Sequence, residues 1–186
     1  MHYLTLILLL TLGITTRFLP HPANFTAIGA IAIFGGLYLP RRWAIVGPLV
    51  AMFVSDIFIG FYSLPIMASV YAGFVIMGLI GLAVRNQIKA TTVLAGTVLG
   101  SVIFFILTNF AVWIFGTMYA HSLAGLAQCY IAALPFFKNS LLSDIFYVSI
   151  MVGGYEFLIN YIRERDSLPT LPTGRQAGRQ APLWSE

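Results

Sequence analysis

The chain has 186 residues, of which 59% are hydrophobic and only 9% are charged, and its mean hydropathy is +0.90. A soluble globular protein carries about 25% charged residues. So short a chain cannot hide this much apolar surface in a core, so the composition predicts an integral protein of the lipid bilayer. The net charge of +4 does not indicate nucleic-acid binding, because the ten basic residues stand singly or in pairs between apolar runs. The single cysteine, Cys129, excludes an internal disulfide framework and a cysteine-rich metal site.

Six apolar segments follow one another along the chain. A membrane span needs about 20 residues, with a range of about 17–25, so each segment is interpreted as a spanning helix. The sequence therefore predicts an all-α fold, a polytopic bundle of about six transmembrane helices formed by residues 1–166. The second segment is short and the fifth is long enough to tilt or to emerge into the headgroups. The segments are Tyr3–Leu19, Phe25–Leu39, Trp43–Phe61, Leu64–Val84, Thr91–Thr117 and Leu141–Ile162.

Two further stretches do not fit the pattern of spans. Residues 119–136 are apolar but contain His121, Gln128 and a late Pro135, which predicts an interfacial or re-entrant helix. Residues 167–186 contain three prolines and a GRQAGRQA duplication. This composition cannot build a packed element, so a disordered C-terminal tail without assigned function is expected.

The basic residues predict the orientation in a membrane. If both termini are cytoplasmic, eight of the ten basic residues face the cytoplasm, as the positive-inside rule requires. A multi-pass protein of the cytoplasmic membrane is therefore expected, although a seventh span at 119–136 would spoil the distribution. The inner residues are Arg41, Arg42, Arg85, Lys89, Arg163, Arg165, Arg175 and Arg179, and the outer ones are Arg17 and Lys138.

Polar residues at membrane depth are costly, so they are candidates for function. The topology above places them all near the outer face, although they come from distant parts of the sequence. Apolar walls with a few convergent polar groups are the usual form of a small-ligand site. The sequence therefore predicts a small-molecule substrate site. Its candidate residues are Asp56, Asn109, Asp144, Asn24, Arg17, Trp113, Tyr119, Lys138 and Asn139.

Each candidate also has a structural interpretation. Asp56 could pair with Arg17 or Lys138 to hold helices together, and Asn109 could bond a neighbouring helix. Asp144 could be a residue near a helix N-terminus that the macrodipole favours. The aromatic candidates could be ordinary residues of the membrane interface. These are Trp113 and Tyr119.

Small residues recur at four-residue spacing, which allows helices to approach closely. The pairs include Ala23 with Ala27 and Ala32 with Gly36. Gly78 and Gly81 are further small residues, in the fourth apolar segment. Packing inside the bundle is one interpretation. A docking surface for another membrane subunit is the other.

Familiar catalytic motifs are absent from the sequence. No Walker A motif precedes Lys89 or Lys138, no HExxH motif occurs, and no G-x-S-x-G elbow surrounds a serine. The chain is therefore not expected to be an enzyme, and no cofactor or metal site is predicted.

Two blocks of sequence resemble a bacterial family of predicted transport proteins, the domain-of-unknown-function 6580 family. The first is RFLPHPANFT at 17–26 with Gly35 and Gly36. The second has TNF at 108–110 with Trp113, LAG at 123–125, LPFFKN at 134–139 and then Asp144. The resemblance covers roughly residues 15–155. In size and number of spans that family is similar to the substrate-binding S components of energy-coupling-factor (ECF) transporters.

The resemblance implies a six-helix bundle that captures a vitamin or another micronutrient from outside. A transmembrane coupling subunit and two cytoplasmic ATPases would be its partners, and the loop Arg17–Asn24 would cover the ligand. The S components dock through an Ala-x-x-x-Ala motif on their first helix, and here the nearest equivalents are the small pairs at 23/27 and 32/36. Two other functions stay open. One is a non-catalytic scaffold or assembly protein, and the other is an intramembrane enzyme with Asp56 and Asp144 as a carboxylate pair.

Overall fold

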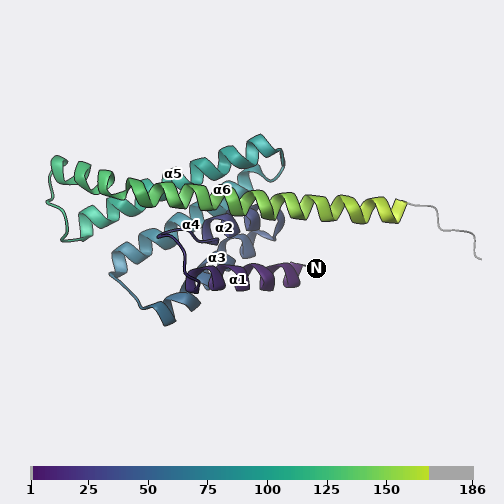
Figure 1. Ribbon diagram of the computed structural model, residues 1–186, viewed down its shortest axis with the longest axis horizontal. Helices are drawn as coiled ribbons and strands as arrows, with labels where there is room; N and C mark the ends of the chain where they lie inside the picture. Colours follow the sequence, from purple (N-terminus) through teal and green to yellow (C-terminus); the bar gives the residue numbers. More distant parts are fainter. Residues whose placement is uncertain (1, 168–186) are drawn as a thin grey trace, which may run out of the picture. The chain divides into compact units, whose positions relative to one another are not determined.

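The protein consists of six α-helices in a computed structural model that describes residues 2–167, with side chains for 4–165. Over those residues it contains no strand, so the predicted all-α fold is confirmed. The first five predicted segments agree with the observed helices to within three residues at each end. The helices are α1 (His2–Phe18), α2 (Ile28–Tyr38), α3 (Arg41–Ile59), α4 (Leu64–Val84), α5 (Ala90–Phe115) and α6 (Leu123–Ser167) (Figure 1).

The chain divides into two compact units, Met1–Val152 and Gly153–Glu186. The first contains α1–α5 and the N-terminal part of α6, and it holds the helix bundle. The second contains the rest of α6. The predicted disordered tail lies outside the described residues from position 168 onward.

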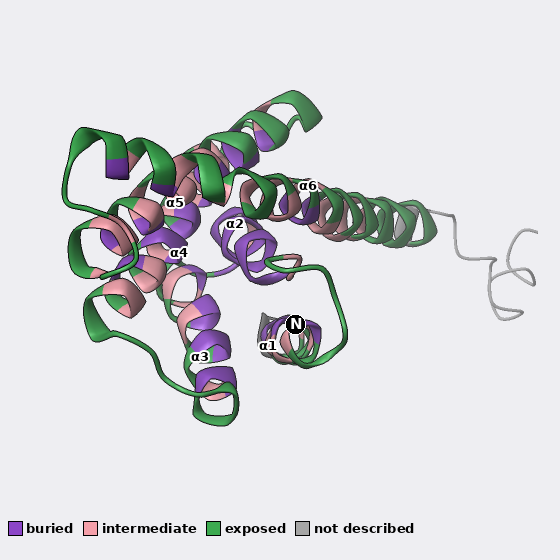
Figure 2. Ribbon diagram, turned by 60° about the vertical axis from the view of Figure 1, so that its left-hand side comes forward, coloured by how far each residue is buried: buried purple, intermediate pink, exposed green. Residues whose placement is uncertain are grey.

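The centre of the first unit is α2, whose residues 28–37 are all buried. A helix that is apolar on every side is stable only when other helices surround it, and α2 packs against α1, α3, α4 and α5. Figure 2 shows this helix coloured as buried along its length. At 11 residues it is far shorter than its neighbours.

Glycine makes the contact between α2 and α4 possible. A Cβ atom on Gly36 would lie 2.5 Å from the Gly78 carbonyl oxygen and 2.6 Å from Gly81 Cα, so the two backbones touch directly. These small residues therefore allow close helix packing inside the bundle, which was one of the two interpretations of the sequence. The other interpretation, a docking surface, is wrong for Ala27, Ala32 and Gly36, because all three are buried in the bundle.

A tight turn joins α3 to α4 and sets the end of α3. Gly60 has φ +111°, a conformation that side chains with a Cβ atom rarely adopt. Its N–H donates to the Asp56 carbonyl and so caps α3. The next helix begins at Leu64 with Pro65 in its first turn, where the missing proline N–H costs nothing.

The region 119–136 differs from the prediction. No separate interfacial helix forms there, because α6 begins at Leu123 and continues through Pro135 into the segment that we predicted as the last span. The reason is packing against α5. The Tyr130 hydroxyl donates to the Ile106 carbonyl at 2.8 Å, and the Phe137 ring lies 4.6 Å from that of Phe105.

Among the described residues, four helices, α3 to α6, are long and apolar enough to cross a membrane, and α1 and α2 are shorter apolar helices. This is compatible with a multi-pass membrane protein. The number of spans, predicted as about six, stays a prediction.

Candidate functional site

A cavity of about 500 Å³ lies within the first unit. Its walls come from the C-terminal ends of α1 and α3, the first turn of α2, residues 66–77 of α4, the C-terminal half of α5, and residues 133–144 of α6. Antiparallel packing brings these parts of the chain to the same end of the bundle. Four of the nine predicted site residues line the cavity, namely Arg17, Asn24, Asn109 and Asp144.

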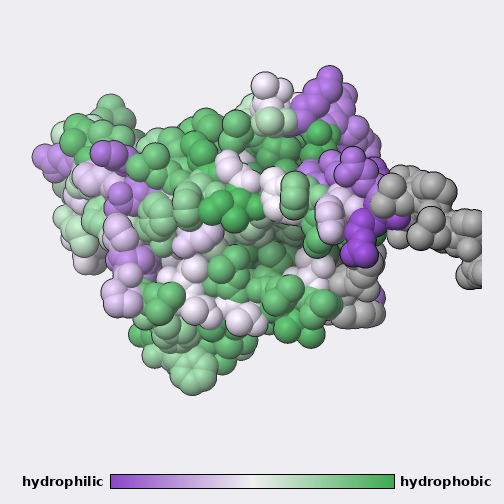
Figure 3. Space-filling view, turned by 45° about the vertical axis from the view of Figure 1, so that its right-hand side comes forward, coloured by the Kyte–Doolittle hydropathy of each residue, from purple (hydrophilic) through white to green (hydrophobic). Residues whose placement is uncertain are grey.

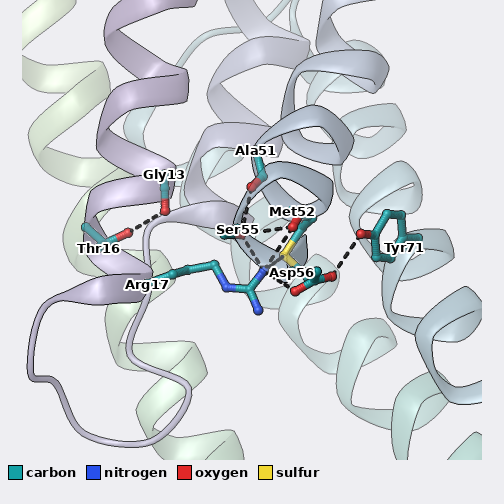
Figure 4. A network of polar contacts seen from close by, with 8 residues as sticks. All are labelled: Gly13, Thr16, Arg17, Ala51, Met52, Ser55, Asp56 and Tyr71. Carbon is teal, nitrogen blue, oxygen red and sulfur yellow. Dashed lines mark hydrogen bonds and ion pairs between the residues drawn. The ribbon is translucent and has the colours of Figure 1, made fainter. Parts of the chain in front are cut away.

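Arg17, at the end of α1, is held by α3. Its Nη1 atom lies 2.8 Å from Asp56 Oδ1, donates to Ser55 Oγ at 2.7 Å and reaches the Met52 carbonyl at 3.3 Å. The Tyr71 hydroxyl of α4 donates to the other carboxylate oxygen of Asp56 at 2.8 Å. Figure 4 shows these groups converging on the two charges from α1, α3 and α4. The network therefore ties three helices together beside the cavity.

Asp56 holds helices together in this arrangement and does not line the cavity. Its side chain is 1% exposed, against 15% for Arg17, and it is not among the residues that line the cavity. The pairing with Arg17 is the structural alternative given above for this residue. Nearby Tyr62, in the α3–α4 turn, does line the cavity. Burial, with a smaller contribution from the negative charge of Asp56, raises the pKa of the Tyr62 hydroxyl, so this group is neutral and can donate.

Asp144 lies deep in the bundle. It accepts a hydrogen bond from Ser101 Oγ at 2.7 Å and packs against Gly29, where a Cβ atom would overlap its carboxylate. The idea that Asp144 is near a helix N-terminus is wrong, since α6 begins about six turns earlier, at Leu123. The sequence placed it near the outer end of the last span. The structure places it against the middle of α5.

The loop before α2 is fastened at several points. Asn24 adopts φ 63°, a left-handed conformation that asparagine tolerates. Asn139 of α6 donates to the Ala23 carbonyl at 3.0 Å, and Ser143 donates to the Thr26 carbonyl at 3.2 Å. Asn139, predicted to contact substrate, therefore holds this loop against α6 and does not line the cavity.

Three other candidates also lie away from the cavity lining. Trp113 donates from its indole N–H to the Ala120 carbonyl at 3.0 Å and packs on the His121 ring, so it fixes the α5–α6 connection. Tyr119 is half-buried in that connection, and Lys138 is exposed on α6. The placement of these residues assigns them to the bundle surface and not to the pocket.

Several lining residues were not among the predicted contacts. Five phenylalanines contribute to the apolar walls, and two buried hydroxyls of α5 line the cavity, those of Ser101 and Thr108. These two and the buried Thr97 are spaced by four and seven residues, so they share one face of the helix. That spacing was the available signal. The phenylalanines are Phe74, Phe104, Phe105, Phe136 and Phe137.

The fold and the cavity define the class. This is an all-helical protein with several apolar helices of membrane length and a cavity of small-molecule size. The chain belongs to the Family of unknown function (DUF6580), which matches residues 1–168. That match reaches beyond both ends of the region on which the resemblance was based. No curated protein and no solved structure matches the chain.

Proposed function

We propose that this protein is a multi-pass protein of the cytoplasmic membrane. The support is its surface: large apolar side chains are exposed on every helix of the first unit except α2, among them Leu8, Phe53, Leu79 and Leu99. Figure 3 shows apolar residues over most of the face drawn. Soluble monomers rarely expose contiguous apolar patches beyond a few hundred Å². Lipid is the solvent that such a surface fits.

The proposed orientation puts the end of the bundle that holds the cavity outside. Four basic residues stand at the end of the first unit opposite the cavity, in or beside the connections α2–α3 and α4–α5. Basic residues of short loops favour the cytoplasmic side. The N-terminus of α1 lies at the same end. The four residues are Arg41, Arg42, Arg85 and Lys89.

The function proposed is substrate binding in a micronutrient uptake transporter, similar to that of an ECF S component. The observation that carries this proposal is the cavity of about 500 Å³, to which distant polar groups of α1, α5 and α6 converge between apolar walls. This volume lies within the range of about 300–1,000 Å³ that is usual for small-ligand pockets. A transmembrane coupling subunit and ATPases would supply the energy for release inside.

The cavity also weighs against the two other functions. A solid bundle without a cavity would favour a scaffold function. The cavity therefore weighs against that function. A carboxylate-pair enzyme needs two acids within hydrogen-bond reach. Here Asp56 bonds Arg17 and Tyr71, whereas Asp144 bonds Ser101.

Co-purification of a bound small molecule tests the proposal. The full chain is extracted from membranes in detergent, purified and precipitated with organic solvent, and the released compounds are identified by mass spectrometry. Ala133 lines the cavity, so Ala133→Trp fills it and should reduce the recovered compound at least ten-fold. The neighbouring Ala132 is exposed and does not line the cavity, so Ala132→Trp is the matched control and should retain it. Equal recovery from wild type and Ala133→Trp would reject the cavity as the binding site.

A further inference from the structure

The formal charges around the cavity do not balance. Arg17 is the one arginine or lysine among the lining residues, and Asp56 lies directly behind it at 2.8 Å. Asp144 is the second carboxylate. Within the part of the chain whose side chains are described, no basic group lies within ion-pair distance of it. Lys138, which the sequence placed in the site, is exposed outside the lining. Apart from the imidazole of His21, which also lines the cavity, one guanidinium therefore stands against two carboxylates.

Asp144 has one hydrogen-bond donor and a helix N-terminus beside it, but no full positive charge among the described residues. Ser101 donates one hydrogen bond to it, and Gly29 lies in the first turn of α2, where the helix dipole is positive. That dipole is equivalent to about half a charge at most. A buried carboxylate is costly unless it is protonated or paired, and a ligand with a full positive charge would supply the pair.

Other groups of the cavity would also accept a cationic ligand. Asn109 donates from Nδ2 to the Phe105 carbonyl of its own helix at 2.8 Å, which leaves its amide oxygen as an acceptor. Four phenylalanine rings form two close pairs, Phe74 with Phe104 at 4.8 Å and Phe105 with Phe137 at 4.6 Å. Aromatic faces attract cations and pack against flat apolar bodies.

We infer that the ligand is a small organic monocation, a protonated amine that pairs with Asp144 while its apolar or aromatic body packs against the phenylalanines. This inference rests on the proposed function of the cavity and names its substrate class. An anion would add to the excess negative charge. A zwitterion would bring a carboxylate with no free positive charge to pair with, because Asp56 at 2.8 Å already balances the charge of Arg17.

Three probes that differ only in their polar end test the charge preference. Phenethylamine is cationic at pH 7, 2-phenylethanol is neutral and phenylacetate is anionic. Each is equilibrated by dialysis with the detergent-purified full chain, and empty micelles give the background. We expect saturable binding of the amine at least ten-fold tighter than that of the alcohol, and no saturable binding of phenylacetate. This series needs no variant, so it holds even if a substitution at Asp144 prevents folding.

Two variants then locate the charge. Asp144→Asn keeps the shape and removes the charge, and it should weaken amine binding at least ten-fold. Glu156→Gln removes a carboxylate of α6 that does not line the cavity, and it should change the affinity by less than about three-fold. Gel filtration and unliganded thermal stability show whether each variant is folded.

Three results would overturn the inference: alcohol or phenylacetate binding as tightly as the amine, amine affinity unchanged in Asp144→Asn, or no saturable amine binding. None of them rejects the cavity as a ligand site. That question is decided separately by the compound recovered from wild type and lost from Ala133→Trp.

Discussion

The ion pair between Arg17 and Asp56 provides a sharp test of the structure. Arg17→Met removes the charge and keeps most of the aliphatic length, and Asp56→Asn removes the charge without changing the shape. The two losses should differ. Without Arg17, the Asp56 carboxylate stays 1% exposed, with the Tyr71 hydroxyl as its remaining hydrogen-bond partner among the described residues. Without the carboxylate, Arg17 is 15% exposed and still reaches Ser55 Oγ and the Met52 carbonyl.

The expected magnitudes follow from this asymmetry. Breaking a buried pair by removing one partner costs about 3–5 kcal/mol, chiefly because the other charge stays buried and unpaired. Arg17→Met should reach this range. Asp56→Asn should cost less, about 1–3 kcal/mol, since the guanidinium keeps neutral acceptors and some water. The double variant leaves no charge unpaired, so the two losses should not add, and a coupling of about 2 kcal/mol is expected.

Unfolding in mixed micelles with rising sodium dodecyl sulfate, followed by tryptophan fluorescence, gives the free energy of unfolding for all four proteins. Two results would refute the reasoning. One is additivity of the single losses to within about 0.5 kcal/mol, which independent sites show. The other is a larger loss for Asp56→Asn than for Arg17→Met, which would mean that the guanidinium, not the carboxylate, is the more buried charge.

Three further predictions use the same measurement. Gly36→Ala should lower the free energy of unfolding by about 1–3 kcal/mol or more, because the new Cβ atom meets the α4 backbone, which cannot yield. Gly153→Ala is the control, because no atom lies within 4 Å of the Cβ position there. Equal effects of the two variants would contradict the contact between α2 and α4. Tyr71→Phe should cost about 2 kcal/mol, as expected for a hydrogen bond to a charged Asp56, and a neutral result would show that this bond is not formed. Asp144→Asn should raise the stability of the unliganded protein by about 1 kcal/mol, or roughly 2–4 °C in Tm. A large loss there would identify Asp144 as a structural residue.

Much of the fold could be predicted from the sequence, because composition and apolar run length predict long apolar helices and their approximate ends. The segment Leu64–Val84 coincides with α4, and the other early segments differ by a few residues. The start of α6 could not be predicted in this way. Pro135 and the polar residues near it argue locally against a long helix, and contacts such as Tyr130 with Ile106 outweigh them.

The site residues, too, could be predicted only in part from the sequence. Helix order and the antiparallel packing of short-looped helices were enough to place Arg17, Asn24 and Asn109 at one end of the bundle, whereas Asp144 lies deeper, against the middle of α5. Which side chains turn inward depends on how each helix is rotated, and hydropathy does not report rotation when every face is apolar. Lys138 belongs to a sequence block near the site but lies exposed on α6.

By itself, therefore, the sequence determined the class of the protein, the succession of its helices and the end of the bundle where costly polar groups gather. Only the tertiary structure decided that Asp56 pairs with Arg17, whereas Asp144 has no basic partner among the residues whose side chains are described. The physical reason is that charge balance in a low-dielectric interior depends on distances of a few ångströms between helices far apart in the chain. Those distances are set by glycine contacts and by the central position of α2, and no local pattern records them.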